Sequence, residues 1–241
     1  PGDIMTLTAA IESLHATYPK QFITDVRTPA REIWENNPHI TRLNESEAET
    51  IEVGYPIIHK SNHRSVAFLE GYTAHLGEKL NLPLRLTTNR PHLYLSEDEK
   101  RWLNQVRDSF PELAQRDVPF WLVNAGVKSD YTAKQWPVEY YQEVIKKTCG
   151  RIQWVQIGSK DHDHPQLRGV LDLRGKTTHR QLIRLAWHAK GGLGPVTYLQ
   201  HLMAAWEKPY CCILGGREPV PWVQYPLQQT FHTIGLLPCC R

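Results

Sequence analysis

Residues 119–124 read PFWLVN, and residues 152–158 read IQWVQIG. Each is a short, mostly apolar run that ends at a polar residue or a glycine, which is typical of a buried strand in a parallel sheet. A helix is predicted between them, with Pro137 near its first turn and apolar residues continuing through Val144 and Ile145. The order strand, helix, strand indicates a parallel βαβ unit, and this unit decides the fold class as α/β.

The same alternation continues through the second half of the chain. We expect strands at residues 170–173 and 210–214, and helices at residues 179–188 and 198–206. Thr178 and Thr197 are the expected N-caps of these two helices. The intervening stretch, residues 191–194, reads GGLG, and we interpret it as a break because glycine weakens a strand interior.

The first half shows a weaker version of this pattern. Apolar residues at helical spacing predict a helix from Leu7 to Tyr18, after a loop that contains Gly2 and Asp3. Ser96, followed by Glu99, predicts a helix that starts with a capping box. The remaining expected elements are a strand at 22–26, a helix at 29–34, a strand near 55–58 and a helix at 66–80, with a polar linker at 112–117.

Composition excludes several classes of protein. Of 241 residues, 41% are hydrophobic and 22% charged, so a sizeable core can form. The net charge is +3, with basic and acidic residues interleaved, which does not favour a nucleic-acid partner. No apolar run reaches the ~20 residues that span a bilayer. The five cysteines are odd in number and include two adjacent pairs, which indicates a reducing compartment rather than a secreted disulfide framework.

Several stretches, in order along the chain, resemble one family of enzymes. Residues 2–5 (GDIM) look like a Gly-Asp loop, residues 134–137 (KQWP) like a Lys-x-Trp-Pro motif, and residues 173–177 (LRGKT) like a Leu-x-Gly-Lys-Thr segment. Residues 197–205 resemble a Ser/Thr-Gly-x-x-His-Leu-x-Ala-Ala helix, with His201 at the histidine. Together they resemble glycosyltransferase family 9, the ADP-heptose:lipopolysaccharide heptosyltransferases.

The resemblance implies a GT-B type fold, in which two Rossmann-like domains face each other across a cleft. We expect residues 1–115 to form the acceptor-side domain and residues 116–241 to form the nucleotide-sugar-binding domain. The family's first strand and terminal helix are expected outside the chain, which would then be truncated at both ends.

The implied activity is inverting, metal-independent transfer of a heptosyl or related group, without a cofactor. The implied donor is ADP-heptose, and the implied acceptor is a lipopolysaccharide core or related glycan. Such an enzyme is expected to be a cytoplasmic monomer that contacts the inner face of the plasma membrane.

Asp3 is the candidate catalytic base. Glycosyl transfer requires the acceptor hydroxyl to lose a proton, and a carboxylate in a glycine-containing turn can approach that hydroxyl. The alternative is that Asp3 is a helix N-cap whose side chain only satisfies backbone N–H groups. The residue type and position favour the cap, whereas the resemblance favours the base.

The candidate donor-binding residues lie near predicted helix N-termini. Lys134 would add a positive charge there for the diphosphate, and Thr197 would offer its hydroxyl and nearby N–H groups. Gly194 would let the chain come close to the ligand. The resemblance places His201 in the donor site. A solvated lysine and a packed histidine are the structural alternatives for Lys134 and His201.

Weaker candidates follow two other strands. Ser159 and Lys160 come directly after the strand at 152–157, where the base or ribose of a nucleotide would lie. His59, Lys60 and Asn62 follow the expected strand near 55–58 and are the candidates for acceptor binding. The alternative for both groups is that they lie in surface turns and bind no ligand.

Residues 161–164 read DHDH, but this spacing fits no common zinc pattern, so we expect a solvated turn and no metal site. Cys239 and Cys240, near the end of the chain, could be free thiols or part of a larger site, and the sequence does not decide between these.

Two positions depart from the family pattern. Val196 stands where the resemblance implies Asp, and Tyr198 stands where it implies Gly. A transferase that uses another nucleotide sugar, and a nucleotide-binding homologue without activity, therefore remain alternatives to the heptosyltransferase.

Overall fold

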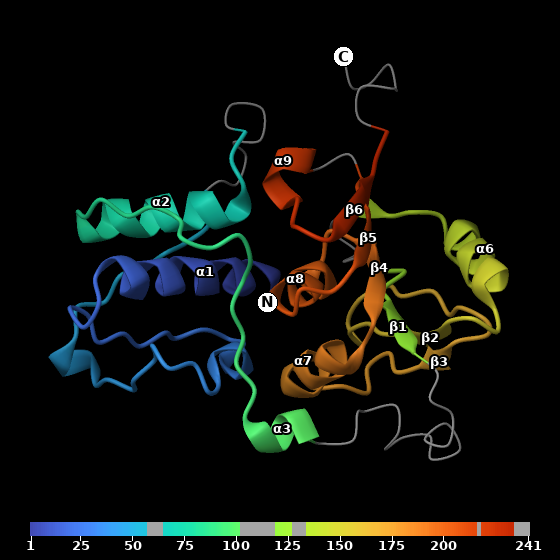
Figure 1. Ribbon diagram of the computed structural model, residues 1–241, viewed down its shortest axis with the longest axis horizontal. Helices are drawn as coiled ribbons and strands as arrows, with labels where there is room; N and C mark the ends of the chain where they lie inside the picture. Colours follow the sequence, from blue (N-terminus) through green and yellow to red (C-terminus); the bar gives the residue numbers. More distant parts are fainter. Residues whose placement is uncertain (57–64, 102–118, 127–133, 216–217, 234–241) are drawn as a thin grey trace.

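The computed structural model describes residues 1–56, 65–101, 119–126, 134–215 and 218–233. In the first half, helices α1 (Gly2–Thr17) and α2 (Phe68–Leu80) lie side by side (Figure 1). Two short 3₁₀ turns lie between them in the chain, η1 (Arg31–Trp34) and η2 (Glu45–Glu47), and the short helix α3 (Glu97–Arg101) follows α2. Among these residues, no helix is both long and apolar enough to cross a membrane.

The second half is a parallel sheet with helices in its connections. Its strands are β1 (Phe120–Val123), β2 (Gln153–Gln156), β3 (Leu171–Asp172), β4 (Gly191–Pro195), β5 (Tyr210–Ile213) and β6 (Gln228–Phe231). They are ordered β3-β2-β1-β4-β5-β6, and every neighbouring pair is parallel. The helices are α6 (Val138–Thr148), α7 (His179–His188), α8 (Tyr198–Ala205) and α9 (Val220–Val223). The predicted α/β class is confirmed.

Helices cover both faces of the sheet. Successive strand residues point to opposite faces, so neighbouring residues of one strand pack against different helices. Leu122 of β1 packs in the same core cluster as α7 and α8, whereas the next residue, Val123, packs in a second cluster with Tyr141 and Ile145 of α6. Figure 1 shows α6 on one side of the sheet and α7 and α8 on the other. Burial on two faces explains why residues 119–123 are apolar throughout.

The stretch GGLG forms strand β4 in the centre of the sheet, so the predicted break is wrong. The glycines are needed because large side chains occupy the space beside them. A Cβ on Gly191 would lie 2.7 Å from the Trp121 ring, and a Cβ on Gly192 would lie 2.9 Å from the Tyr210 ring. Aromatic residues on β1 and β5 therefore take the place of the missing side chains on β4.

The strand predicted at 22–26 is also wrong, since only an isolated parallel bridge joins Thr24 and Ile40. The Asp25 carboxylate explains part of the difference, because it accepts hydrogen bonds from the backbone N–H groups of Val26 (2.9 Å) and Leu43 (3.3 Å). These N–H groups are thus satisfied without a strand ladder. The strand predicted near 55–58 extends into residues that the structure does not describe. The linker predicted at 112–117 lies entirely within such residues. The division into two facing domains stays a prediction.

The capping box predicted at Ser96 and the N-cap predicted at Thr178 are both confirmed. At α3, the Ser96 hydroxyl accepts from the N–H of Glu99 at 3.1 Å, and the Glu99 carboxylate accepts from the N–H of Ser96 at 2.9 Å. At α7, Thr178 and Gln181 make the equivalent pair of bonds, at 3.1 and 2.9 Å. Each box satisfies two backbone N–H groups that the helix itself cannot.

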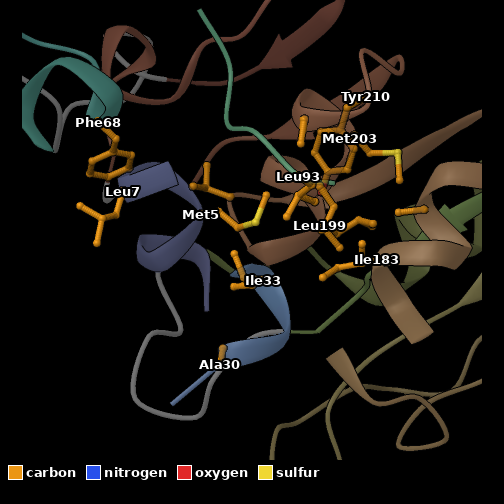
Figure 2. Packing of buried hydrophobic residues seen from close by; sticks show 14 of the residues in the cluster. Met5, Leu7, Ala30, Ile33, Phe68, Leu93, Ile183, Leu199, Met203 and Tyr210 are labelled. Atoms are coloured by element: carbon orange, nitrogen blue, oxygen red, sulfur yellow. The ribbon is translucent and has the colours of Figure 1, made fainter. Parts of the chain in front are cut away.

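One hydrophobic core joins α1 to the helices of the sheet. Met5 of α1 and Leu199 of α8 are buried in the same cluster, together with Ile33 of η1 and Leu93 of the segment before α3 (Figure 2). Burying one such side chain contributes about 1.5–3 kcal/mol. This shared core holds the first turn of α1 against α8, and that contact matters for the candidate site below.

A buried arginine adds a polar connection between the same regions. The Arg180 guanidinium of α7 donates to both carboxylate oxygens of Glu99, at 2.5 Å each, and to the backbone carbonyls of Tyr94 (2.9 Å) and Glu32 (3.1 Å). Burial works to raise the pKa of Glu99, but hydrogen bonds from Arg180 and Ser96 outweigh it and leave that pKa below the ordinary value. Arg180 therefore links α7 to three segments of the first half.

The tight contact at β4 predicts the effect of adding one methyl group. Gly191→Ala forces the Trp121 ring to move, and we expect a loss of about 1–3 kcal/mol in the free energy of unfolding, as for other overpacked cores. Urea unfolding measures this. In a Trp121→Leu background the ring is absent, so the same change should cost clearly less; equal costs in the two backgrounds would show that the ring is not the obstacle.

Candidate functional site

The carboxyl ends of β1, β4 and β5 lie at one edge of the sheet and bring polar groups together. Asn124 follows β1, Thr197 follows β4, and Glu218 lies five residues beyond the end of β5. The Asn124 amide donates to the Thr197 hydroxyl at 3.2 Å. Ligands of open parallel sheets bind at this edge.

Thr197 occupies the N-cap position of α8, as predicted, but its side chain makes no capping hydrogen bond. Its hydroxyl instead accepts from Asn124. The backbone N–H groups of the first turn of α8 are therefore not covered by the side-chain cap that Thr usually supplies. Such N–H groups, together with the helix dipole, favour an anion at this end of α8.

Lys134 lies beside this helix end. Its ammonium group donates to the Val196 carbonyl at 3.1 Å and contacts the Glu218 carboxylate at 2.5 Å. The Lys134 side chain is only 18% exposed, so the alternative of a solvated surface lysine is wrong. Val196 itself is buried in the core, and it contributes its backbone carbonyl rather than a side-chain charge.

His201 lies one turn into α8 and is buried. Its Nδ1 pairs with the Tyr225 hydroxyl at 2.7 Å. Burial, and after it the positive charge of Lys134, lower the pKa of His201 to about 3. The imidazole is thus neutral at neutral pH. The alternative of a packed histidine matches these contacts, and a role in donor binding stays a prediction.

The N-terminal end of α1 meets this region. A Cβ on Gly2 would lie 3.4 Å from the His201 ring and 3.9 Å from the backbone N of Tyr198. The ends of α1 and α8 therefore approach each other closely, as Figure 1 also shows. Two helix N-termini, whose dipoles favour an anion, thus lie near the Lys134 ammonium and its partner, the Glu218 carboxylate.

Asp3 lies inside the first turn of α1, because the helix starts at Gly2 rather than after a loop. Both expectations about its surroundings are corrected: the residue is not in a turn, and the N-cap position belongs to Pro1. The negative charge of Asp3 acts on Tyr72 of α2, where burial and then Asp3 raise the pKa of the phenol. The Asp3 carboxylate is therefore near α2, and it does not serve as a cap.

Asp3 also lines a groove of about 930 Å³ on the first half of the chain. Its walls are apolar side chains of α1, of α2 and of the stretches around residues 22–28 and 43–55. Its lining also includes six carboxylate residues: Asp3, Asp25, Glu45, Glu47, Glu49 and Glu52. The acceptor candidates His59, Lys60 and Asn62 lie just beyond this stretch, outside the described residues.

The other donor candidates lie at the same edge of the sheet but in different surroundings. Ser159 donates its backbone N–H to His164 at 3.2 Å, and the Lys160 chain packs against Gly175 beyond β3. Both are exposed. A Cβ on Gly194 would lie 2.7 Å from the Asn124 carbonyl oxygen, so this glycine is required for packing of β4 itself. A ligand contact for these three residues stays a prediction.

The structure adds residues that the sequence reasoning missed: Asn124, Glu218 and Tyr225. Asn124 ends an apolar strand, which was the available signal. Glu218 lies in the stretch between β5 and α9, but nothing in the local sequence pairs it with Lys134, 84 positions away. Within the described ranges, no group of three or more His, Cys, Asp or Glu side chains is arranged to hold a metal ion.

The low pKa of His201 predicts a specific pH dependence of stability. The folded protein keeps this ring neutral, whereas the unfolded chain binds a proton below the ordinary pKa of 6.5. Stability should therefore decline as the pH falls from 6.5 towards 3. In His201→Gln, which cannot take up the proton, the free energy of unfolding should change less over the same range. Equal slopes for the two proteins in urea unfolding would contradict the buried, neutral state.

Comparisons with known proteins find solved structures with the same fold. The chain is similar in structure to E. coli ADP-heptose lps heptosyltransferase II, with a TM-score of 0.66, 19% identity, and 95% of this chain and 87% of that chain covered. A glycosyl transferase family 9 protein from Veillonella parvula has a TM-score of 0.72 at 15% identity, with 96% and 83% covered. At these identities the likeness shows a shared fold.

A third similar structure is the iron-containing dodecameric glycosyltransferase TibC from E. coli, with a TM-score of 0.57, 15% identity, and 95% of this chain and 59% of that chain covered. A comparison with curated proteins found no match. Residues 68–236 match the family model described as Glycosyltransferase family 9 (heptosyltransferase). This match includes most of the chain and the edge of the sheet where Lys134 contacts the Val196 carbonyl next to Thr197, and the chain therefore belongs to glycosyltransferase family 9.

Proposed function

We propose that this glycosyltransferase moves a heptosyl or related group from ADP-heptose to a lipopolysaccharide core or related glycan. The observation that carries the proposal is the meeting of the Lys134 ammonium with the uncapped N-terminus of α8 at the ends of β4 and β5. One similar protein is named an ADP-heptose heptosyltransferase, and TibC was solved in complex with ADP-D-beta-D-heptose. Both support an ADP-sugar as the donor.

The donor diphosphate would lie against α8. When the bond between the anomeric carbon and the diphosphate breaks, negative charge grows on the departing phosphate oxygens. The Lys134 ammonium and the N–H groups at the start of α8 are placed to stabilise that charge. The Thr197 hydroxyl adds one more polar contact at the same point.

Asp3 would act as the general base. Its carboxylate takes the proton from the acceptor hydroxyl while the acceptor oxygen bonds to the anomeric carbon, and ADP leaves with the bonding electrons. Attack from the face opposite the leaving group inverts the anomeric configuration. Asp3 is suited to this role because α1 begins next to His201 of α8, so the base lies at the donor side of the molecule.

The acceptor would approach along the groove beside Asp3. Arg27 is the one basic residue among the described residues that line this groove, against six carboxylates. Such a charge balance favours the uncharged, hydroxyl-bearing part of a glycan there, because phosphate would be repelled. His59, Lys60 and Asn62 are proposed to contact the acceptor further along.

In this proposal the reaction takes place between an acceptor-side part, residues 1–115, and a nucleotide-sugar-binding part, residues 116–241, and a site enclosed between them excludes water from the donor. The enzyme works as a cytoplasmic monomer at the inner face of the plasma membrane and uses neither a metal nor a cofactor. Gly194, Ser159 and Lys160 complete the donor side, towards the ribose and base.

A second candidate is a transferase that uses a different nucleotide sugar. Val196 and Tyr198 favour it, because they replace the Asp and Gly of the family pattern at the start of α8. Val196 is buried and carries no charge, so any contact that a carboxylate would make with the sugar is absent here. A homologue that binds nucleotide without catalysis is less favoured, since Asp3 and Lys134 are both present.

Calorimetric titration with ADP, GDP and UDP tests the donor. We expect selective binding of ADP, unchanged by a chelator, and weakened at least about tenfold in Lys134→Ala because one charge-assisted contact is lost. Lys147→Ala is the matched control, since this lysine is 72% exposed and pairs only with Glu143 of its own helix among the described contacts. A preference for GDP or UDP would favour the second candidate, and dependence on a metal would contradict the proposal.

Asp3→Asn tests the base. The variant keeps the size of the side chain but cannot accept the proton, so turnover should fall about 10²-fold or more while nucleotide affinity stays near wild type. Glu52→Gln removes a different carboxylate of the same groove and should retain activity. Turnover of the Asn variant within a fewfold of wild type would remove Asp3 from the mechanism.

A further inference from the structure

Glu218 reaches the candidate site from the segment between β5 and α9. Its side chain is 5% exposed, and one carboxylate oxygen lies 2.5 Å from the Lys134 ammonium. The two residues come from different parts of the chain, since Lys134 precedes α6 and Glu218 precedes α9. The contact is therefore a product of the fold and not of local sequence.

The pair is largely shielded from solvent, with side chains 18% (Lys134) and 5% (Glu218) exposed. Cys212 at the end of β5 is fully buried, and its pKa is raised to about 12, first by burial and then by the negative charge of Glu218. The thiol therefore stays neutral, and among the described contacts the Lys134 ammonium is a positive partner of Glu218. A buried ion pair of this kind adds little to the free energy of unfolding compared with apolar residues of similar size. Its contribution is therefore better sought in the fixed position that it gives to the Lys134 ammonium.

We infer that Glu218 is a positioning residue that holds the Lys134 ammonium at the N-terminus of α8 for the diphosphate of the donor. A lysine side chain has four rotatable bonds, so it needs partners to keep its charge at one point. Val196 and Glu218 take two of the three ammonium N–H groups, and a ligand oxygen takes the third. This inference rests on the proposed role of Lys134 in donor binding.

The test compares Glu218→Ala, Glu218→Gln, Lys134→Ala and the double variant Glu218→Ala/Lys134→Ala, with ADP as the probe in calorimetry. Glu218→Ala should weaken ADP binding about tenfold, because the ammonium loses its fixed position. Glu218→Gln keeps an oxygen acceptor and should restore affinity to within about threefold of wild type. In the Lys134→Ala background, loss of Glu218 should have less than a twofold effect, since Glu218 acts through Lys134.

A second measurement needs no nucleotide. Reductive methylation of the free protein, followed by mass spectrometry, gives the rate at which Lys134 is modified. Glu218→Ala should raise that rate severalfold because the side chain is released from its partner. Glu139→Ala removes an exposed carboxylate near the start of α6 and is the matched control, which should change neither the methylation rate nor ADP affinity.

The outcomes separate the inference from the proposed function. Unchanged ADP affinity and methylation in both Glu218 variants, with weakened binding in Lys134→Ala, would overturn the inference and leave the proposed function standing. Stronger ADP binding in Glu218→Ala would also overturn it, since the main effect of Glu218 would then be to repel the diphosphate of ADP. Wild-type protein that binds no nucleotide, with faster methylation in Glu218→Ala, would mean that the proposed function fails and that the pair is structural.

Discussion

The parallel direction of β1, β4 and β5 is the constraint on which the candidate site depends. All three strands end at the same edge of the sheet, so Asn124, Thr197 and Glu218 gather there although they are far apart in sequence. Lys134 reaches this edge from the residues before α6 and contacts both Val196 and Glu218. Reversal of any of these strands would separate the groups, since their following segments would then lie at opposite edges.

The second requirement is the core that joins α1 to α8. Met5 and Leu199 belong to one hydrophobic cluster, and Gly2 lies against His201. The contact has a chemical consequence, because the crowded interior keeps His201 neutral and leaves Lys134 as the positive side chain beside Thr197. The position of Asp3 relative to α8 therefore follows from packing in the core and not from a flexible loop.

Much of the second half could be predicted from local patterns. The mostly apolar runs at 119–124, 152–157 and 210–214 form β1, β2 and β5, because burial on both faces favours apolar residues along the whole strand. The errors have physical causes as well. The glycines at 191–194 predicted a break because the sequence does not show which residues lie beside them. In the structure Trp121 and Tyr210 fill the space beside these glycines, and the stretch forms β4. At residues 22–26 the Asp25 carboxylate takes backbone N–H groups that a strand ladder would otherwise use.

The sequence by itself determined the α/β class, the capping box at Ser96, the N-cap at Thr178 and, through the motifs at 134–137 and 197–205, the family. These depend on residue types at short spacing, which local chemistry controls. Only the tertiary structure decided that Thr197 leaves α8 without a side-chain cap, that His201 is buried with Tyr225, and that Glu218 holds Lys134. Each of these depends on groups that are distant along the chain, and their distances are set by how the sheet and α1 pack together.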